Sequence, residues 1–559
     1  MKIVGRLTLS LLLLLLLALV ALYLLLQTRW GAEWASRRIS DDTTYHLSVG
    51  KIEHNFSSPA LLTLRNVSFG HDGQPAVMVA KTVNLGLRLS LFNDTLRFTR
   101  VELQDGTLNV ANMPAKMAWP LQADRLQLRN MTLNSPRLAV KAVALNGGVI
   151  PWQPHAGNAL GNNASFQASA DSVTLQGITA ANALIQGRIG NGQLAINNFG
   201  ADLARGSVTG SAQRDAQGNW NVSALRLNDL RLQTDKSLSA FLQPLRDLPP
   251  VHFSRVDLTD ARLQGADWAV TDLDLLLKNL TLRNGNWQSD DGSLAMNADS
   301  FINGQLTLNE PILNLEFSPQ GVADGRFSSR WVNGLIRAQG SWLRQTRQLT
   351  LDELALAGLE YTLPDNWRDR WMAMLPAWLD SVRVKKLSGS RNLIIDVNPH
   401  YPFQITALDM NGTDLLLARN RQWGLWQGAL NLNAAEATFN RTDIRHPSMT
   451  LNADAAQIAV TEMSAFAGKG MLEGLATLDQ SPARHLSLTL NGRAVPADVL
   501  QNWGWPAPAL SGEASLQLKL EARLAADTPL SRSANGALTL SADGQTLQQT
   551  MVNGEVSPH

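Results

Sequence analysis

Acidic and amide side chains recur at one position of a repeated pattern, and they are the residues of this sequence best placed to do chemistry. The pattern is a leucine, any residue, an Asp, Asn or Glu, a small or apolar residue, any residue and an apolar residue. Seven copies begin at Leu64, Leu103, Leu128, Leu227, Leu258, Leu277 and Leu351. Two copies carry Asp229 and Asp260, whereas three others carry Asn66, Asn130 and Asn279. A position that accepts Asn needs no titratable group, so we interpret it as backbone chemistry.

The same position marks a change of phase in the strand pattern. Leu225 and Leu227 share one parity with Asp229, while Leu230 and Leu232 have the other. Asn and Asp hydrogen-bond to local backbone and tolerate the left-handed conformation. A one-residue slip is typical of a β-bulge or a tight corner, and bulges increase the local twist. The repeats therefore predict a sheet that curls.

Other catalytic patterns are absent from the sequence. The nine His residues are scattered and form no HExxH motif. Gly206–Gly210 resembles a nucleophile elbow but has Val208 at its centre, where a serine is required. Gly187, Gly190 and Gly192 are in the wrong order for a dinucleotide-binding loop. We expect no enzyme, no cofactor and no metal site; a glycan hydrolase with carboxylates from distant strands is the enzymatic alternative.

The amino-acid composition excludes further classes of protein function. The 559 residues are 45% apolar and 17% charged, enough to bury more than one core's worth of surface. The net charge of +1 lacks the basic excess of nucleic-acid binders, so we expect no nucleic-acid partner. Cys is absent, which rules out disulfides and thiolate metal ligands.

One segment has the length and composition of a membrane anchor. Leu7–Leu26 is an apolar run of about 20 residues, the length that a helix needs to cross a bilayer. It is too long for a cleaved signal peptide, and Trp30 stands where a cleavage site before Gly31-Ala32 needs a small residue. Lys2 and Arg6 precede the run, which predicts a cytoplasmic N-terminus.

The rest of the chain alternates with a period of two residues, as strands with one dry face do. Examples are Leu393-Ile395-Val397, Leu486-Leu488-Leu490 and Leu516-Leu518-Leu520. Short connections rich in Gly, Asn and Asp favour antiparallel neighbours. Three stretches have helical spacing instead, at Ser237–Leu245, Asp365–Trp378 and Pro496–Trp503. Such helices either cap or plug the sheet, rest against a lipid surface, or pack on the core.

These segments predict a five-part division. The parts are a stub and anchor over 1–28, an N-terminal β region over 29–235, a second β region over 236–363, a third over 364–495, and a C-terminal helix with strands over 496–559.

The two ends of the chain resemble a known family. Arg37–Val110 looks like the amino-terminal signature of the AsmA family, with a short helix, a strand around Gly50 and the segment Leu62–Gly70. Leu490–Leu524, with the following Ser533–Gln548, is similar to that family's C-terminal block. The middle of the chain, roughly 150–480, matches only in its repeated strands.

The resemblance implies a mainly β fold: an N-terminal transmembrane helix, then an elongated, curled antiparallel β-sheet with an apolar groove and a few short helices. It implies a single-pass protein of the bacterial inner membrane with its body in the periplasm. The implied function is binding or transfer of phospholipid for the outer membrane. The alternative is a non-enzymatic scaffold or regulator of protein targeting to and assembly in the outer membrane, with envelope assembly proteins as partners.

Alternation alone fits both an open groove and a closed sandwich. If the groove exists, the apolar residues of the repeated pattern are our candidates for its lining: Leu64, Val67, Leu227, Leu230, Leu232, Leu258, Leu263, Leu280 and Leu282.

Overall fold

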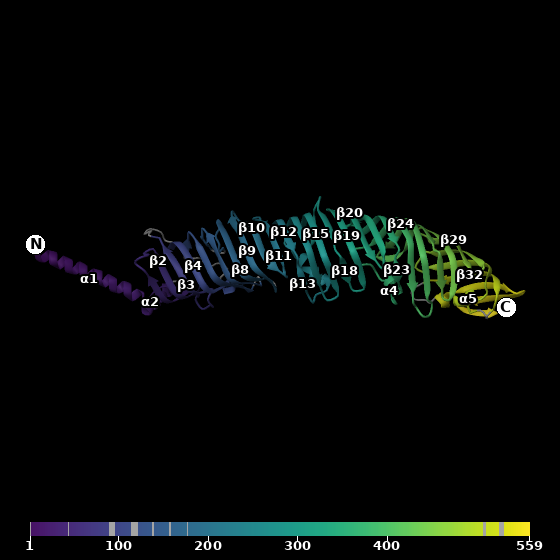
Figure 1. Ribbon diagram of the computed structural model, residues 1–559, viewed down its shortest axis with the longest axis horizontal. Helices are drawn as coiled ribbons and strands as arrows, with labels where there is room; N and C mark the ends of the chain where they lie inside the picture. The colour runs from purple at the N-terminus through teal and green to yellow at the C-terminus, as the bar shows by residue number, and fades with distance from the viewer. Residues whose placement is uncertain are drawn as a thin grey trace. The chain divides into compact units, whose positions relative to one another are not determined.

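The computed structural model describes residues 2–42, 44–88, 96–112, 121–136, 139–155, 158–175, 177–506, 510–524 and 530–558. Most of these residues lie in strands, as the alternation predicts, and the helices are few (Figure 1). The chain forms two compact units. Unit 1 comprises Met1–Gln233, Leu242–Leu263 and Thr281–Asn286, and unit 2 comprises Thr234–Phe241, Gln264–Leu280 and Trp287–His559. The finer five-part division stays a prediction.

Unit 1 begins with two helices and continues as strands. Its elements are α1 (Lys2–Leu26), α2 (Arg29–Asp42), β1 (Tyr45–His54), β2 (Leu61–His71), β3 (Met78–Leu87), β4 (Leu96–Asn109), β5 (Leu121–Ala123), β6 (Leu126–Ser135), β7 (Val140–Ile150), β8 (Ala164–Leu175), β9 (Ile178–Gly190), β10 (Gln193–Leu203), β11 (Gly206–Arg214), β12 (Trp220–Asn228) and β13 (Arg231–Gln233). Four elements contain residues of both units: α3 (Leu238–Leu242), β14 (Val251–Gln264), β15 (Trp268–Arg283) and β16 (Asn286–Trp287).

Unit 2 is built the same way. Its elements are β17 (Ser293–Asn297), β18 (Ser300–Asn303), β19 (Leu306–Ser318), β20 (Gly321–Trp331), β21 (Gly334–Leu343), β22 (Gln348–Ala357), β23 (Glu360–Thr362), α4 (Trp367–Met372), β24 (Ser381–Asp396), β25 (Phe403–Arg419), β26 (Gln422–Asn433), β27 (Glu436–Phe439), β28 (Thr442–Ala453), β29 (Gln457–Ala467), β30 (Gly470–Asp479), β31 (His485–Pro496), α5 (Val499–Asn502), β32 (Glu513–Arg523), α6 (Leu530–Ser533), β33 (Asn535–Ala542), β34 (Gln545–Val552) and β35 (Glu555–Pro558).

Most neighbouring strands are antiparallel, but parallel pairs occur at three places in the described part of the chain. β4 runs parallel to β5 and β6, β12 to β14, and both β22 and β23 to β24. Parallel neighbours need a crossover of about a dozen residues or more. α3 lies in the connection from β12 to β14, and α4 lies in the connection from β22 to β24. Two of the three predicted helical stretches therefore mark the points where the chain crosses back to keep the same strand direction.

The predicted helices form, although two are shorter than the sequence suggests. The first stretch becomes α3 followed by a 3₁₀ turn over Gln243–Leu245. α4 ends at Met372, where Ala373 adopts an extended backbone, and Pro376 disfavours a return to helical geometry at Leu375. α5 spans four residues and buries Val499 and Leu500. Of the three alternatives for the predicted helices, α5 therefore packs on the core. α4 buries none of its residues.

The repeated pattern has the backbone that its Asn and Asp residues predict. Six of the seven copies have a left-handed residue at the third position, with φ between 50° and 55°: Asn66, Asp105, Asn130, Asp229, Asp260 and Asn279. The seventh residue, Glu353, has no positive φ, and the pairing of β21 with β22 changes register there instead. Neighbouring copies also contact each other, because Asn130 donates a hydrogen bond of 2.7 Å from Nδ2 to Asp105 Oδ1.

The left-handed residue moves the next apolar side chain back to the covered face. Asn130 and the residue before it are exposed, whereas Met131 is fully buried. The same order holds at Asp260 and Ala261. The phase change predicted from the sequence is thus a local corner, after which the apolar side chains continue on the covered face.

The N-terminal helices meet at a sharp bend. Among residues with described side chains, no single helix is long and apolar enough to cross a membrane. The pair Leu12–Leu26 and Arg29–Asp41, bent by 83°, satisfies the same criteria together.

Candidate apolar ligand cavity

The nine groove candidates chosen from the sequence are all at least partly buried. Val67, Leu230 and Leu280 are buried, and the other six are half-buried: Leu64, Leu227, Leu232, Leu258, Leu263 and Leu282. Val67 is part of a closed apolar cluster in unit 1 that Leu64 packs against. Whether any of the nine contacts a ligand stays a prediction.

A large apolar cavity lies elsewhere, inside unit 2. It encloses about 950 Å³ and is lined by strands β24 to β32, by β34 and by the segments around α5 and α6. None of the nine candidates lines it. The apolar side chains around it are Ile394, Ile405, Leu408, Met410, Leu432, Phe439, Ile444, Met449, Met463, Leu472, Leu488, Leu490, Leu500, Trp503, Trp505, Leu518, Leu520, Leu530 and Met551.

Cross-strand pairing builds one wall of the cavity as a continuous row. Met410 pairs with Leu432, Leu432 with Met449, and Met449 with Met463. The row continues through Gly474 to Leu490 and Leu518. We call these seven residues the apolar row. At about 4.8 Å per strand, its six steps span roughly 29 Å, which suits a long, narrow ligand.

Gly474 leaves room within the apolar row. A Cβ at this position would lie 2.3 Å from Cε of Met463, so the methionine side chain occupies the space that a larger residue would fill. Methionine is unbranched and adapts to irregular surfaces. Met410, Met449 and Met463 therefore make this wall adjustable.

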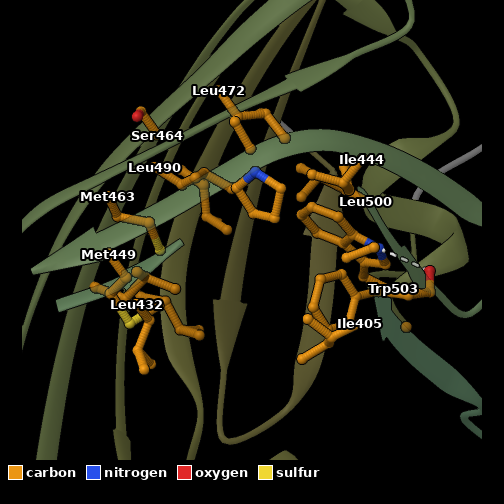
Figure 2. A pocket seen from close by; sticks show the side chains of 18 of the residues that line it. Ile405, Leu432, Ile444, Met449, Met463, Ser464, Leu472, Leu490, Leu500 and Trp503 are labelled. Carbon is orange, nitrogen blue, oxygen red and sulfur yellow. Dashed lines mark hydrogen bonds between the residues drawn. The ribbon is translucent and has the colours of Figure 1, made fainter. Parts of the chain in front are cut away.

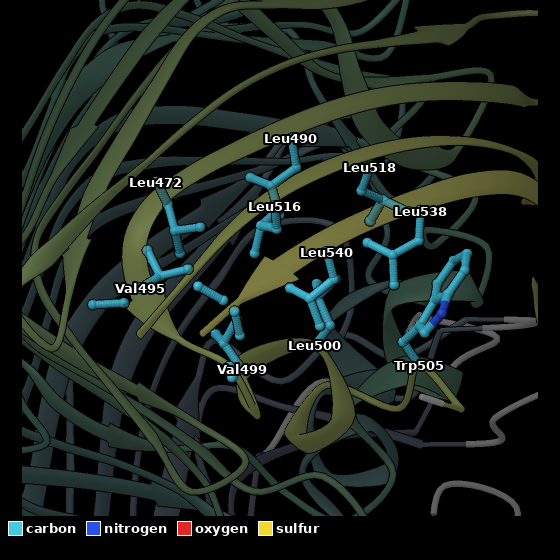
Figure 3. Packing of buried hydrophobic residues seen from close by; sticks show 14 of the residues in the cluster. Leu472, Leu490, Val495, Val499, Leu500, Trp505, Leu516, Leu518, Leu538 and Leu540 are labelled. Atoms are coloured by element: carbon cyan, nitrogen blue, oxygen red, sulfur yellow. The ribbon is translucent and has the colours of Figure 1, made fainter. Parts of the chain in front are cut away.

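The opposite side of the cavity comes from the segment around α5. Figure 2 shows Leu500 and Trp503 beside Ile405 and Ile444 on one side of the space, while Leu432, Met449 and Met463 lie together on the other. Val499 and Leu500 also pack against Leu516 and Leu540 in the buried cluster beneath the curved strands (Figure 3). The helix is thus fixed by its own core contacts and holds Trp503 at the cavity.

The cavity offers a ligand very little polarity. Its only polar side chains other than the two indoles are Asn433, Ser448 and Ser464, and none of its described lining residues is charged. Ser448 Oγ donates to Asn433 Oδ1 at 2.8 Å. The Trp503 indole donates to the carbonyl of Phe439 at 3.1 Å, and that of Trp505 donates to Gln549 Oε1 at 3.0 Å. Most of its few polar groups thus already have partners, and the surface left is hydrocarbon.

Such a surface has the chemistry to accommodate alkyl chains. Among the described residues, no three His, Asp or Glu side chains gather where they could hold a metal ion. The sequence contained one signal for this site, which is the presence of methionines at 410, 449, 463 and 551, on the strands β25, β28, β29 and β34.

Comparison with known proteins agrees with the resemblance at the two ends of the chain and extends it over the middle. The AsmA family model matches residues 1–548. AsmA family protein YicH of Escherichia coli (strain K12) is 48% identical over 560 residues, which cover 100% of this chain and 98% of that protein. No solved structure matches the chain significantly. The match to the family model extends from one end of the chain nearly to the other, and on this ground the chain belongs to the AsmA family.

Proposed function

We propose that this protein is anchored in the bacterial inner membrane and binds or transfers phospholipid, with acyl chains held in the cavity of unit 2. Family membership supports a role of this kind in the cell envelope. The observation that carries the proposal is the apolar row, which lines an uncharged cavity of about 950 Å³. A contribution to the lipid supply of the outer membrane follows from such a role.

The energetics favour a lipid tail as the occupant. Each methylene group removed from water contributes about 0.8 kcal/mol. Ten buried methylenes contribute roughly 8 kcal/mol, before the cost of immobilising the chain. A phosphate group would gain little inside, because an unpaired charge is costly where the described lining holds no charged group. The headgroup therefore stays outside the cavity.

Anchoring rests on α1. Between residues 12 and 25, eleven of its apolar side chains are 42–68% exposed. A soluble helix does not leave such a continuous apolar surface in water. With Lys2 and Arg6 on the cytoplasmic side, the strands that follow α2 stand in the periplasm.

One observation favours the second candidate, a scaffold or regulator of protein targeting and assembly at the outer membrane. The crossover that contains α4 exposes Trp371, Met372, Met374 and Trp378, each by more than half. Exposed apolar clusters of this kind mark binding surfaces, and methionine is favoured where partners vary.

Photo-crosslinking separates the two candidates. A photoreactive residue at Leu490 or Met463 faces the cavity, whereas one at the exposed neighbours Asn491 or Glu462 faces solvent. We expect phospholipid to be captured in cells at 490 and 463 but not at 491 or 462. Equal capture at all four positions, or none at the two cavity positions, contradicts the lipid proposal and favours the scaffold.

A further inference from the structure

Helix α2 is held on the first strand of unit 1 by one face. Ala32 is fully buried, and Ser36 is 7% exposed. Ser36 Oγ accepts a hydrogen bond of 3.0 Å from the backbone N–H of Val49, and Ser40 Oγ accepts one of 3.0 Å from that of Leu47. The serine further along α2 bonds to the residue that comes earlier in β1. Helix α2 therefore runs antiparallel to β1.

The opposite face of α2 exposes two tryptophans. Trp30 and Trp34 are four residues apart, so they lie on one side of the helix, and they are 62% and 56% exposed. The side chains of α2 that pack in the unit 1 cluster do not include them. These two large aromatic side chains are therefore not part of the buried cluster of unit 1.

A third exposed aromatic residue comes from the loop between β1 and β2. Phe56 is 75% exposed, and its ring centroid lies 4.8 Å from that of Tyr23 on α1. Tyr23 is fixed in turn by His54, because its hydroxyl lies 2.7 Å from Nδ1 of the imidazole. Tyr23 is three residues before the end of α1, or about 4.5 Å along the axis at 1.5 Å per residue.

We infer that Tyr23, Trp30, Trp34 and Phe56 form an aromatic collar that seats unit 1 on the lipid bilayer surface. The inference rests on the membrane anchor of the proposed function. If α1 crosses the bilayer, the 83° bend places α2 nearly in the plane of the surface. Tyr and Trp favour this interface, where the ring is shielded and its polar atom stays hydrated.

The alternative occupant of the collar is another protein. The bilayer is favoured because the collar is continuous with the exposed leucines of α1, so one apolar surface runs from the helix to the rings. Helix α2 carries three Arg residues and three acidic residues, so its attraction to the surface does not depend on lipid charge.

The collar also sets the direction in which unit 1 grows. Because β1 lies along α2, it runs nearly parallel to the bilayer surface. Each further strand then stands about 4.8 Å farther away. Seven strand pairings separate β1 from β9, which corresponds to roughly 34 Å.

The absence of Cys makes the test direct, because single cysteines can be labelled in the full-length protein. Phe56→Cys and Trp34→Cys carry a fluorescent probe in the collar. Leu16→Cys places it on α1, and Asn191→Cys places it in the turn after β9. Each variant is reconstituted in phosphatidylethanolamine–phosphatidylglycerol vesicles containing lipids that bear a quencher either near the headgroup or deep in the acyl chain.

We expect headgroup-level quenchers to remove most of the emission at 56 and 34, deep quenchers to act at 16, and neither to act at 191. Quenching at 16 with none at 56 and 34 overturns the collar while the anchor stands. Loss of quenching at 16 as well overturns both the anchor and the collar. Phospholipid capture in the cavity is measured separately, so neither result is confused with failure of the cavity proposal.

Discussion

In unit 1, the apolar face of the sheet is covered by the chain's own side chains. Ala32 from α2 and Trp152 from the segment after β7 lie in one cluster with Met131, and none is more than 5% exposed. In unit 2, the segment around α5 covers the apolar face only in part, and about 950 Å³ remains open between Trp503 and the apolar row. Both faces are built from strands with the same alternation.

The difference therefore lies in the covering segments. In unit 1, Trp152 is held in place by a hydrogen bond of 2.9 Å from its indole N–H to the carbonyl of Ala159. Its backbone also pairs with Ala123, so the ring fills the space over the sheet. In unit 2, Trp503 lies at the edge of the cavity, fixed to Phe439. Where a large side chain is anchored therefore decides whether the apolar face of the sheet is filled or leaves a cavity.

A matched pair of methionines tests this comparison most strongly. Met131→Ala in unit 1 is expected to destabilise that unit by about 2–5 kcal/mol, because it leaves a hole in a filled cluster. Met463→Ala in unit 2 is expected to cost about 1 kcal/mol, because the thioether already borders empty space. Native-state hydrogen exchange of the amides in β6 and β29 measures the two losses separately.

The comparison is wrong if the two substitutions cost the same. An equal, large loss at Met463 would mean that the cavity wall is packed as tightly as the unit 1 cluster. Leu64→Ala is the control for unit 1, since this side chain is only half-buried and should give a smaller effect than Met131→Ala.

Larger side chains at buried alanines also test whether unit 1 is filled and unit 2 holds a cavity. Ala123 is fully buried, and Ala123→Leu is expected to destabilise unit 1 by about 1–3 kcal/mol through overpacking. Ala465 lines the cavity, so Ala465→Leu should change stability by no more than about 0.5 kcal/mol. It should also lower phospholipid capture at Leu490, measured by the same crosslinking. Equal destabilisation by both leucines would contradict the open cavity.

Local chemistry in the sequence predicted much of the framework. Alternation located the strands, and the Asn or Asp of the repeated pattern located six left-handed corners, because both depend on neighbouring residues alone. The parallel pairs were missed, although the connections that contain α3 and α4 are long enough for crossovers.

The cavity could not be located in the same way. The candidates ran from Leu64 to Leu282, because the repeated pattern is clearest there. The cavity is formed where Leu500 and Trp503 face strands that precede them by up to about a hundred residues. Which apolar face stays uncovered depends on such distant contacts, and alternation looks the same in a filled cluster and in a cavity wall.

The smallest expected change in stability concerns the repeated pattern, which occurs in both units. Asp229 in unit 1 has φ +55°, whereas Glu353 in unit 2 has no positive φ. Asp229→Val is expected to cost about 1–2 kcal/mol, because a branched Cβ is strained in the left-handed region. Asp229→Gly and Asp229→Asn should be tolerated, and the second keeps the corner while removing the charge that pairs with Arg231.

At Glu353, valine should be tolerated, because the backbone there is compatible with a branched residue and the ion pair with Lys386 is exposed and 3.9 Å long. Hydrogen exchange in β12 and β22 measures both effects. A loss at Glu353→Val equal to that at Asp229→Val would show that the pattern needs its polar side chain, whatever the backbone. A loss of stability for Asp229→Val alone would show that this position needs a residue that tolerates the left-handed backbone. It is this corner that turns the following apolar side chains toward the covered face.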